Sequence, residues 1–526
     1  MRTSQSPLVR TLVLFSILTV IFLFFLPTLH NRFVPTWDDS ESLTENVYVH
    51  SLTANHLKAI FSTAAFKAYL PLPYIPLTLF SYSLEYKFFG LNPFIYHLDN
   101  LLLHLAVTAL LMLFIRQIGL SFGAAVWACL LFGLHPMHVE SVAWVTERKD
   151  VLYAFFYMLA LCTYIDYIRY PNKVSYGLTI LWGLLSVLSK PMALSLPLIL
   201  LLCDWWCKRR WNGRVFLEKM PFILYMAGAC WITYTKYMRP VHTEWHQKIL
   251  IWVWSFVFYV EKFIFPAVLL PHYVLPQPVL YFHPAYLSAG ALLLIFLYTL
   301  VRFYRNRLFI FAWLFYFLSI FFLIRYENVI LVGNLSIVAD RFMYLPSVGF
   351  CILFGVCVEK LLIYSHMRAL WTRNISLAGI GVLFIILGTD TFMQCKTWKN
   401  DITLWSDVIE KSPNDPLGFV NRALGYKALG QYDLAIADDT KAIGMDPGYY
   451  ISSRHPKNEM TRSIDDTNLA LANNPLLVIA YRNRGFVYKE MGKDTLAMKD
   501  FNKVMEINPQ DTEVKAAAAE LSRIPY

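Results

Sequence analysis

Repeated apolar stretches, each about as long as a bilayer is thick, are the feature that most limits how this chain can fold. A membrane-spanning helix needs roughly 20 mostly apolar residues. Composition points the same way, because 57% of the 526 residues are hydrophobic and only 16% are charged, whereas an ordinary soluble protein carries about a quarter charged residues. The sequence therefore predicts an all-α, polytopic membrane bundle and argues against a soluble enzyme. We expect eleven spans, at 11–29, 95–115, 122–138, 150–168, 175–189, 191–206, 220–236, 285–303, 308–324, 343–361 and 375–392.

The net charge of +10 belongs to the apolar part of the chain. Residues 395–526 contain 17 basic and 18 acidic residues, while residues 1–394 contain 29 basic and 18 acidic ones. In a soluble protein such an excess would suggest nucleic-acid binding. Here the excess lies in loops between spans, so we expect no nucleic-acid partner. We predict a membrane domain at 1–394 and a polar extracytoplasmic domain at 395–526.

Lys and Arg in the short loops predict the orientation, because cytoplasmic loops are enriched in them. An N-terminus in the cytoplasm places most loop Lys and Arg on that side. An odd number of spans then places residues 395–526 on the outer side, which is the periplasm of a bacterial inner membrane in the interpretation that we favour, or the endoplasmic reticulum lumen as the alternative. Residues 249–270 are apolar enough to cross, but a crossing there would invert every later basic loop. We interpret this segment as a re-entrant or interfacial helix.

The polar tail has an internal period of 34 residues, which separates Pro413 from Pro447 and Pro475 from Pro509. Gly430 and Gly492 recur at matching positions within the units. The period resembles that of the tetratricopeptide repeat, a helix–turn–helix unit, and predicts a short α-solenoid. The stretch from 448 to 475 is six residues short of a full repeat. Such arrays form a groove that binds peptides or partner proteins; a folded spacer is the alternative.

Two adjacent carboxylates, Asp38 and Asp39, follow the first span directly. A carboxylate can serve as general base for a hydroxyl nucleophile. On local sequence alone, a solvated acidic pair or a helix cap is the better explanation.

A second polar cluster follows the third span. His135, His138 and Glu140 are candidate metal ligands, although their spacing does not match the zinc-helix pattern with two histidines four residues apart; histidines satisfied by hydrogen bonds are the alternative. Arg148 and Lys149 are candidates for binding a phosphate group, Arg by a bidentate fork and Lys as a point charge. Asp150 completes this cluster.

Two further outer positions carry cations. Lys190 lies in a tight turn between two spans, where it binds an anion or snorkels for structural reasons. Arg341 precedes the tenth span, where it contacts an anionic lipid headgroup or positions the span.

These motifs together resemble the GT-C type of integral-membrane glycosyltransferase, and among those the transmembrane O-mannosyltransferase family with C-terminal tetratricopeptide repeats. The resemblance rests on the order of motifs along nearly the whole chain. They are Trp37-Asp38-Asp39, Gly90-Leu91-Asn92-Pro93, Tyr96-His97, Leu103-His104, His135-Pro136-Met137-His138-Val139-Glu140, Arg148 with Asp150, Ser189-Lys190, Asp340-Arg341-Phe342-Met343-Tyr344-Leu345-Pro346 and the Trp398–Pro413 entry into the repeats.

The resemblance implies transfer of a sugar, mannose in this family, from a polyprenyl-phosphate carrier to an acceptor hydroxyl, with inversion, on the outer side of the membrane. The acceptor that it implies is a protein Ser or Thr, presented by the repeats. No cofactor is certain and a divalent metal is possible. The implied base is Asp39, with Asp38 as helper or alternate. The implied donor-phosphate and lipid contacts are Arg148, Lys149, Arg341, Lys190 and Tyr344, and the groups that orient the cations or the sugar are His135, His138, Glu140 and Asp150.

Two other classes of function compete with this reading. A lipid-linked sugar transporter would place polar groups deep within spans and would show internal repeats of the membrane half, which the sequence does not display. A membrane-anchored repeat scaffold would not require the Asp38-Asp39 pair.

Overall fold

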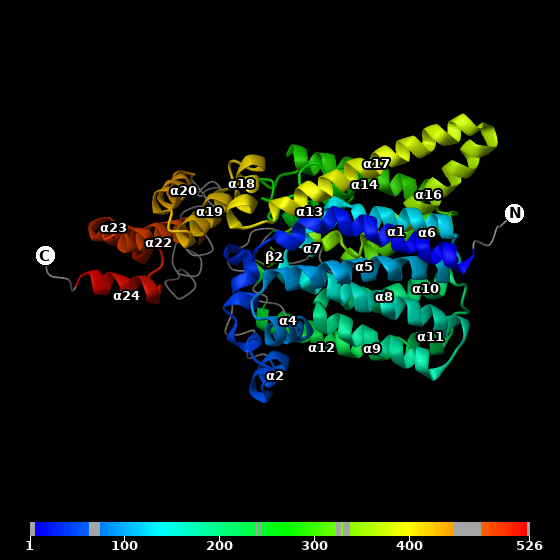
Figure 1. Cartoon of the computed structure of the whole chain (residues 1–526), viewed down its shortest axis with the longest axis horizontal. Helices are drawn as coiled ribbons and strands as arrows, with labels where there is room; N and C mark the ends of the chain where they lie inside the picture. Colours follow the sequence, from blue (N-terminus) through cyan, green and yellow to red (C-terminus); the bar gives the residue numbers. More distant parts are fainter. Residues whose placement is uncertain are drawn as a thin grey trace.

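The computed structural model describes residues 6–62, 74–237, 240–241, 244–321, 328–329, 337–445 and 475–522. Regular structure in these ranges is almost entirely helical, as predicted. The exceptions are two strands of two residues, β1 (Pro240–Val241) and β2 (Asn328–Val329), which pair antiparallel. A long bundle of helices is followed by a smaller array that extends beyond one end of the bundle (Figure 1).

All eleven predicted spans fall on helices of the bundle within the described residues; residues 322–324 of the span predicted at 308–324 lie outside them. By length and composition, six described helices can cross a membrane, or seven if the bent pair Phe122–Leu134 and Pro136–Ala143 counts as one span. Three more apolar helices, at 173–189, 191–206 and 307–320, are shorter than a bilayer is thick. The eleven helices are α1 (Pro7–Phe25), α5 (Pro93–Gln117), α6 (Phe122–Leu134), α8 (Arg148–Arg169), α9 (Lys173–Ser189), α10 (Leu196–Trp206), α12 (Met220–Tyr237), α14 (Pro284–Arg302), α15 (Arg307–Ile320), α16 (Ser347–Arg368) and α17 (Leu370–Thr397).

The N-terminus lies at the end of the bundle that is opposite the repeats, as do α11 (Gly213–Leu217) and the turn between α16 and α17 (Figure 1). The loop before α15 joins the same end, because the Arg307 guanidinium donates to the carbonyls of Trp205 at 2.5 Å and Trp206 at 3.0 Å. The basic loops that we assigned to the cytoplasm are therefore brought together at one end. The outer loops with the candidate site lie at the other.

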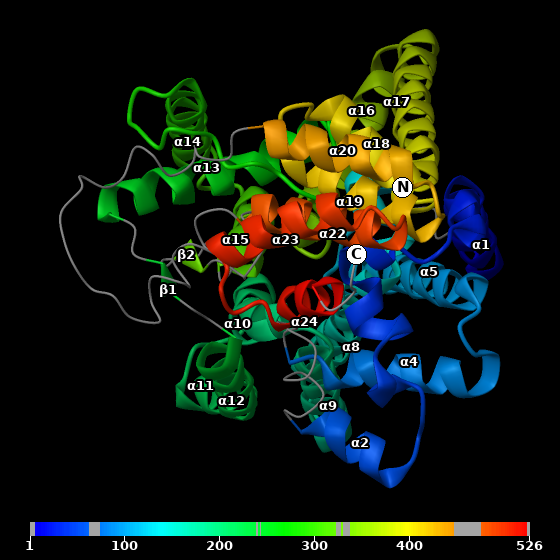
Figure 2. The ribbon, with the colours of Figure 1, turned by 90° about the vertical axis from the view of Figure 1, so that its left-hand side faces the viewer.

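Helix α13 (Trp245–Ile264) differs in direction from the spans. Figure 2 looks along the bundle and shows α13 lying across it, whereas α14 is seen end-on. This is the geometry of an interfacial helix, which we expected for residues 249–270. Two other outer helices precede the second span, namely α2 (Ala54–Phe61) and α4 (Pro76–Phe89).

Short helical turns connect the spans at the outer end. Most are single 3-10 turns, and η2 is a π-helical turn whose Trp37 has non-helical dihedral angles. They are η1 (Leu26–His30), η2 (Pro35–Thr44), η3 (Val47–Val49), η4 (Pro136–His138), α7 (Val139–Ala143), η5 (Val145–Glu147), η6 (Pro191–Ser195) and η8 (Asp340–Met343).

Small residues let α6 and α16 approach closely. A Cβ atom on Gly355 would lie 2.2 Å from the backbone oxygen of Ala124 and 3.0 Å from the Cβ of Ala128. Apolar lipid provides no hydrophobic drive for two apolar helices to associate, so close backbone packing of this kind is what holds them together.

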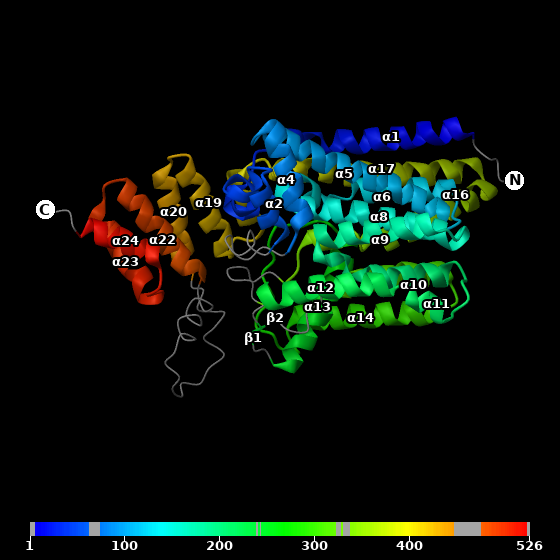
Figure 3. The same cartoon turned by 90° about the horizontal axis from the view of Figure 1, so that it is seen from below.

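The polar tail forms the expected helical pairs, which continue away from the bundle (Figure 3). Gly430 and Gly492 adopt φ angles of +71° and +69°, the left-handed conformation that each turn between helices requires. The units also share an ion pair at 2.7 Å, Arg422 with Asp438 and Arg484 with Asp500. The short middle unit, 448–475, lies outside the described residues apart from Pro475. The helices are α18 (Asp401–Lys411), α19 (Pro416–Ala428), α20 (Tyr432–Gly444), α22 (Pro475–Glu490), α23 (Asp494–Ile507) and α24 (Thr512–Leu521).

The α6–α16 contact generates a stability prediction. Gly355→Ala forces a methyl group against the Ala124 carbonyl, so we expect the free energy of unfolding to fall by about 1–3 kcal/mol. Gly379→Ala is the matched control, because a Cβ atom there meets nothing within 4 Å; it should be neutral or slightly stabilising. Thermal unfolding in detergent measures both, and equal stability of the two variants would contradict the packing described.

Candidate functional site

Asp39 is fully engaged in holding two outer segments together. Its Oδ2 accepts from the backbone N–H of Val34 at 2.7 Å, and its Oδ1 accepts from the backbone N–H and hydroxyl of Thr146 at 3.1 and 2.5 Å. The side chain is buried, and burial raises the pKa of Asp39 to about 6. Asp39 therefore ties η2 to η5, a contact whose partner, Thr146, the sequence analysis did not identify.

Asp38 has a different environment from its neighbour. It is half-buried, and its carboxylate has no hydrogen bond or ion pair with any residue that the structure describes. Burial raises the pKa of Asp38 above its usual 3.8, while the positive charges of Lys149 and Arg341 act in the opposite direction. Asp38 is thus the carboxylate of the pair that is left available to a ligand.

The cations near Asp38 converge on one buried carboxylate, that of Glu147. Its Oε1 lies 2.8 Å from Lys149 Nζ and 3.2 Å from Arg341 Nε, and its Oε2 lies 3.3 Å from Lys190 Nζ. The Glu147 side chain is 1% exposed. We name Glu147, Lys149, Lys190 and Arg341 the Glu147 cluster; the sequence analysis identified the three cations but not their shared partner.

Two further carboxylates extend the Glu147 cluster. Glu140 accepts from the backbone N–H of Arg341 at 2.9 Å and from its guanidinium at 2.5 Å. Asp150 accepts from Lys190 and, at 3.1 Å, from the hydroxyl of Ser141. The structure thus places both carboxylates against cations, which fixes the direction of those side chains.

Trp144 forms the wall behind two of the cations. Lys149 Nζ lies 5.4 Å and the Arg341 guanidinium carbon 5.5 Å from the centre of its ring. Arg341 keeps 17% of its side chain exposed, against 7% for Lys149. The arrangement presents positive charge to one small region beside Asp38, with Arg341 as its most accessible member.

Arg148 points away from this region, contrary to what its position in the sequence suggests. Its Nη1 pairs with Glu85 at 2.6 Å, its Nε donates to Asn100 at 2.7 Å and its Nη2 donates to the carbonyl of Tyr96 at 2.8 Å. The side chain is 1% exposed. Because a helix turns by about 100° per residue, Arg148 and Lys149 face different neighbours, and Arg148 joins α8 to α4 and α5 instead of facing a ligand.

The histidines are satisfied by hydrogen bonds within the protein. The Nε2 of His135 lies 2.8 Å from the carbonyl of Phe263, and its Nδ1 accepts from Met137 N–H at 3.2 Å. The ring nitrogens of His138 lie 2.7 Å from the carbonyl of Phe132 and 3.1 Å from the hydroxyl of Ser347. Among the described residues, no group of three or more His, Cys, Asp or Glu side chains can hold a metal ion.

Tyr344 is buried within this aromatic region. Its hydroxyl lies 2.7 Å from Nδ1 of His104, and its ring packs on those of Phe132 and His138. The structure therefore places Tyr344 in the packing that supports η8, and not among the exposed cations.

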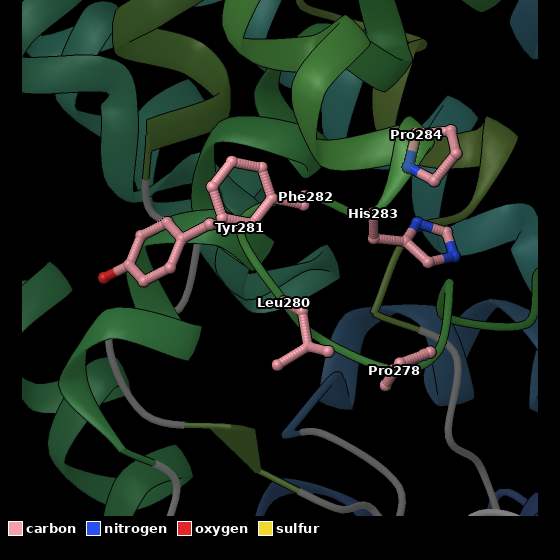
Figure 4. Close-up of a pocket in the computed structure, with 6 residues that line it drawn as sticks. All are labelled: Pro278, Leu280, Tyr281, Phe282, His283 and Pro284. Carbon is pink, nitrogen blue, oxygen red and sulfur yellow. The ribbon is translucent and has the colours of Figure 1, made fainter.

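An apolar cavity of about 410 Å³ lies apart from these groups (Figure 4). The loop between α13 and α14, together with the first residue of α14, lines it, and Phe282 is 88% exposed. The cavity contains neither Asp38 nor a cation of the Glu147 cluster. Its lining consists of Pro278, Leu280, Tyr281, Phe282, His283 and Pro284.

Comparisons with known proteins agree with both parts of the structure. A tetratricopeptide repeat family model matches residues 479–511. The Protein O-mannosyl-transferase F38B6.6 of Caenorhabditis elegans is 26% identical over 437 residues, which cover 78% of this chain and 60% of that protein. The chain is thus similar, over most of its length, to a protein named as a protein O-mannosyl-transferase.

The chain also aligns over shorter stretches with other proteins named as protein O-mannosyl-transferases. The Protein O-mannosyl-transferase tmtc2 of Xenopus laevis is 42% identical over 97 residues, 18% of this chain and 11% of that protein. Human Protein O-mannosyl-transferase TMTC4 is 30% identical over 176 residues, 29% of this chain and 23% of that protein. The chain thus spans about three fifths of the worm relative and smaller shares of the others.

Among solved structures, ArnT from Cupriavidus metallidurans bound to undecaprenyl phosphate aligns with 92% of this chain and 88% of its own. The TM-score is 0.36 and the sequence identity is 13%.

The environment of Arg148 predicts that this residue, unlike Lys149, has a structural role. Arg148→Met leaves the buried Glu85 without its cation and leaves the acceptors of Asn100 and Tyr96 without their donor, so we expect the free energy of unfolding to fall by about 3–5 kcal/mol. The double variant Glu85→Met/Arg148→Met removes both charges and should be markedly more stable than the single variant. Thermal unfolding in detergent tests both, and a single variant as stable as the unmodified protein would show that the pair is not structural.

Proposed function

We propose that this protein is an inverting glycosyltransferase that moves a sugar, mannose by analogy with its homologues, from a polyprenyl-phosphate carrier to an acceptor hydroxyl. The observation that carries the proposal is the half-buried, unpaired carboxylate of Asp38 beside the cations of the Glu147 cluster. Asp38 can serve as the base for a hydroxyl, and the cations can bind a phosphate. A single displacement requires both functions.

Asp38 accepts the proton of the acceptor hydroxyl as its oxygen attacks the anomeric carbon of the donor sugar. A new glycosidic bond forms while the bond between that carbon and the phosphate oxygen breaks. The electron pair leaves with the polyprenyl phosphate, and the sugar inverts its configuration. Asp39 does not touch the reactants in this mechanism; it positions Asp38 through its bonds to Val34 and Thr146.

Arg341 and Lys149 stabilise the charge that develops on the leaving phosphate. Both lie against the ring of Trp144, and Arg341 is the more exposed of the two. Lys190 contributes from the far side of Glu147, where it also pairs with Asp150. Arg148 has no part, because its donors bind Glu85, Asn100 and Tyr96.

The proposed acceptor is a Ser or Thr hydroxyl of a protein, and the repeats at 395–526 are its proposed docking domain. The basic loops gather at the opposite end of the bundle, which supports an outer location for the reaction. That side is the periplasm in a bacterial cell and the lumen in the endoplasmic reticulum.

Asp38→Asn should abolish most of the transfer activity, because removing a general base costs roughly 10²- to 10⁴-fold in rate. Transfer of labelled mannose from a polyprenyl-phosphate donor to a peptide measures the effect on purified protein. Asp39→Asn is the comparison variant; it should lose less activity but more stability, because Asp39 bonds to two segments of backbone. An Asp38→Asn protein that transfers sugar at the unmodified rate would exclude this base.

The dependence of rate on pH provides a second test of the same assignment. The base acts only when ionised, so the rate should fall as the pH is lowered through the pKa of Asp38, which burial raises above 3.8. The positive charge of Lys149 lowers that pKa, so Lys149→Gln should raise it and move the acid limb of the pH–rate profile to higher pH. Lys173→Gln, on the exposed start of α9, is the matched control and should leave the limb in place. Coincident limbs for all three proteins would contradict the assignment.

A further inference from the structure

We infer that the entrance to the repeat domain, from Trp398 to Trp405, positions the base and the phosphate-binding cations, so that this entrance supports the active site and is more than a tether for the repeats. This inference rests on the proposed function. It concerns residues that touch no reactant in the mechanism above, and it therefore assigns them positioning roles.

The first link is a hydrogen-bonded latch between α18 and η2. Asp401 accepts from the backbone N–H of Thr36 at 3.1 Å and also from the Thr36 hydroxyl. The same hydroxyl oxygen accepts from Trp405 Nε1 at 2.7 Å. The side chain of Thr36, two positions before Asp38, thus binds two residues of α18, Asp401 and Trp405.

The latch and Asp39 hold Asp38 from both sides. After Asp38 in the chain, Asp39 is bound to the membrane domain through Thr146. Before Asp38, Thr36 is bound to α18 through Asp401. The direction of the unpaired Asp38 carboxylate therefore depends on α18 as much as on the bundle. A base must lie within about 3 Å of the proton it takes, so a loose η2 would reduce the rate of the chemical step.

The second link is a group of four tryptophans. Trp405 packs edge-on to Trp37 with ring centres 5.2 Å apart, and Trp37 lies 6.0 Å from Trp144. Trp398 stacks on Trp144 at 5.5 Å and 19°. Lys149 and Arg341 lie over the Trp144 ring. Trp398, at the end of the last span, therefore packs against the ring that both cations contact.

Two hydrogen bonds to backbone carbonyls connect the same two parts of the chain. The carbonyl of Lys399 accepts from Arg32 N–H at 2.9 Å, and the carbonyl of Cys395 accepts from the Asn31 side chain at 3.0 Å. These bonds join the end of α17 to the segment between α1 and η2. The entrance to the repeats therefore contacts both chemical halves of the site, the carboxylate through Thr36 and the cations through Trp144.

The test compares Thr36→Val with Thr36→Ser in the full-length protein. Valine keeps the shape of the side chain and removes the hydroxyl that joins Asp401 to Trp405, whereas serine keeps the hydroxyl. Asp407→Asn is the control on the same helix, because Asp407 pairs with Lys411 and does not contact Thr36. The measurements are kcat and KM for the donor and for a peptide acceptor, thermal unfolding, and quenching of tryptophan fluorescence by a polyprenyl phosphate without sugar.

We expect Thr36→Val to lower kcat by roughly 10- to 100-fold, because misplacement of a reacting group by about 1 Å has an effect of this size. Donor KM and the quenching should stay unchanged, and Thr36→Ser and Asp407→Asn should retain the unmodified kcat. The inference is overturned if Thr36→Val keeps the unmodified kcat, if only the acceptor KM rises, or if kcat falls only in proportion to the unfolded fraction. An unmodified protein that transfers no sugar would instead refute the proposed function, and the inference with it.

Discussion

The burial of Glu147 is the constraint on which the end of the bundle next to the repeats depends. An ionised carboxylate that is 1% exposed is stable only when cations and hydrogen-bond donors compensate for the lost water. Lys149 comes from the first turn of α8, Lys190 from the end of α9 and Arg341 from η8. Three segments that are far apart in the chain must therefore meet at one point. That meeting brings three cations to one place, and Arg341, with 17% of its side chain exposed, is the one that a lipid-linked phosphate could reach most easily.

The same physical principle explains why adjacent aspartates have different roles. Asp39 receives three hydrogen bonds from Val34 and Thr146 and serves as an anchor. The carboxylate of Asp38 is influenced by the positive charges of Lys149 and Arg341 and has no hydrogen bond with the described residues. The sequence analysis placed Asp39 first because it could not distinguish the two side chains. We propose the reverse order, since a carboxylate whose acceptor positions are filled by the protein is poorly suited to accept a further proton.

Local signals in the sequence were sufficient for the elements but not for the contacts between them. Apolar length predicted all eleven bundle helices, and the 34-residue spacing predicted the repeats with their glycine turns. Span counting was less successful, because α9, α10 and α15 are too short to cross by length alone. The role of the histidines was also ambiguous in the sequence. His135 and His138 are of a residue type that binds metals, yet their ring nitrogens form hydrogen bonds with the carbonyl groups of Phe263 and Phe132.

The sequence by itself determined the class of the protein, its helices, its repeats and the set of charged side chains at the outer end, because these follow from apolar length, periodicity and the distribution of charge along the chain. Only the tertiary structure decided which of those charges act together. Arg148 and Lys149 are adjacent, yet one pairs with Glu85 and the other with Glu147, since neighbours on a helix face different partners. The contacts of Asp401 and Trp405 with Thr36, in the segment around Asp38, join residues more than 350 positions apart, and no local pattern encodes a pairing over that distance.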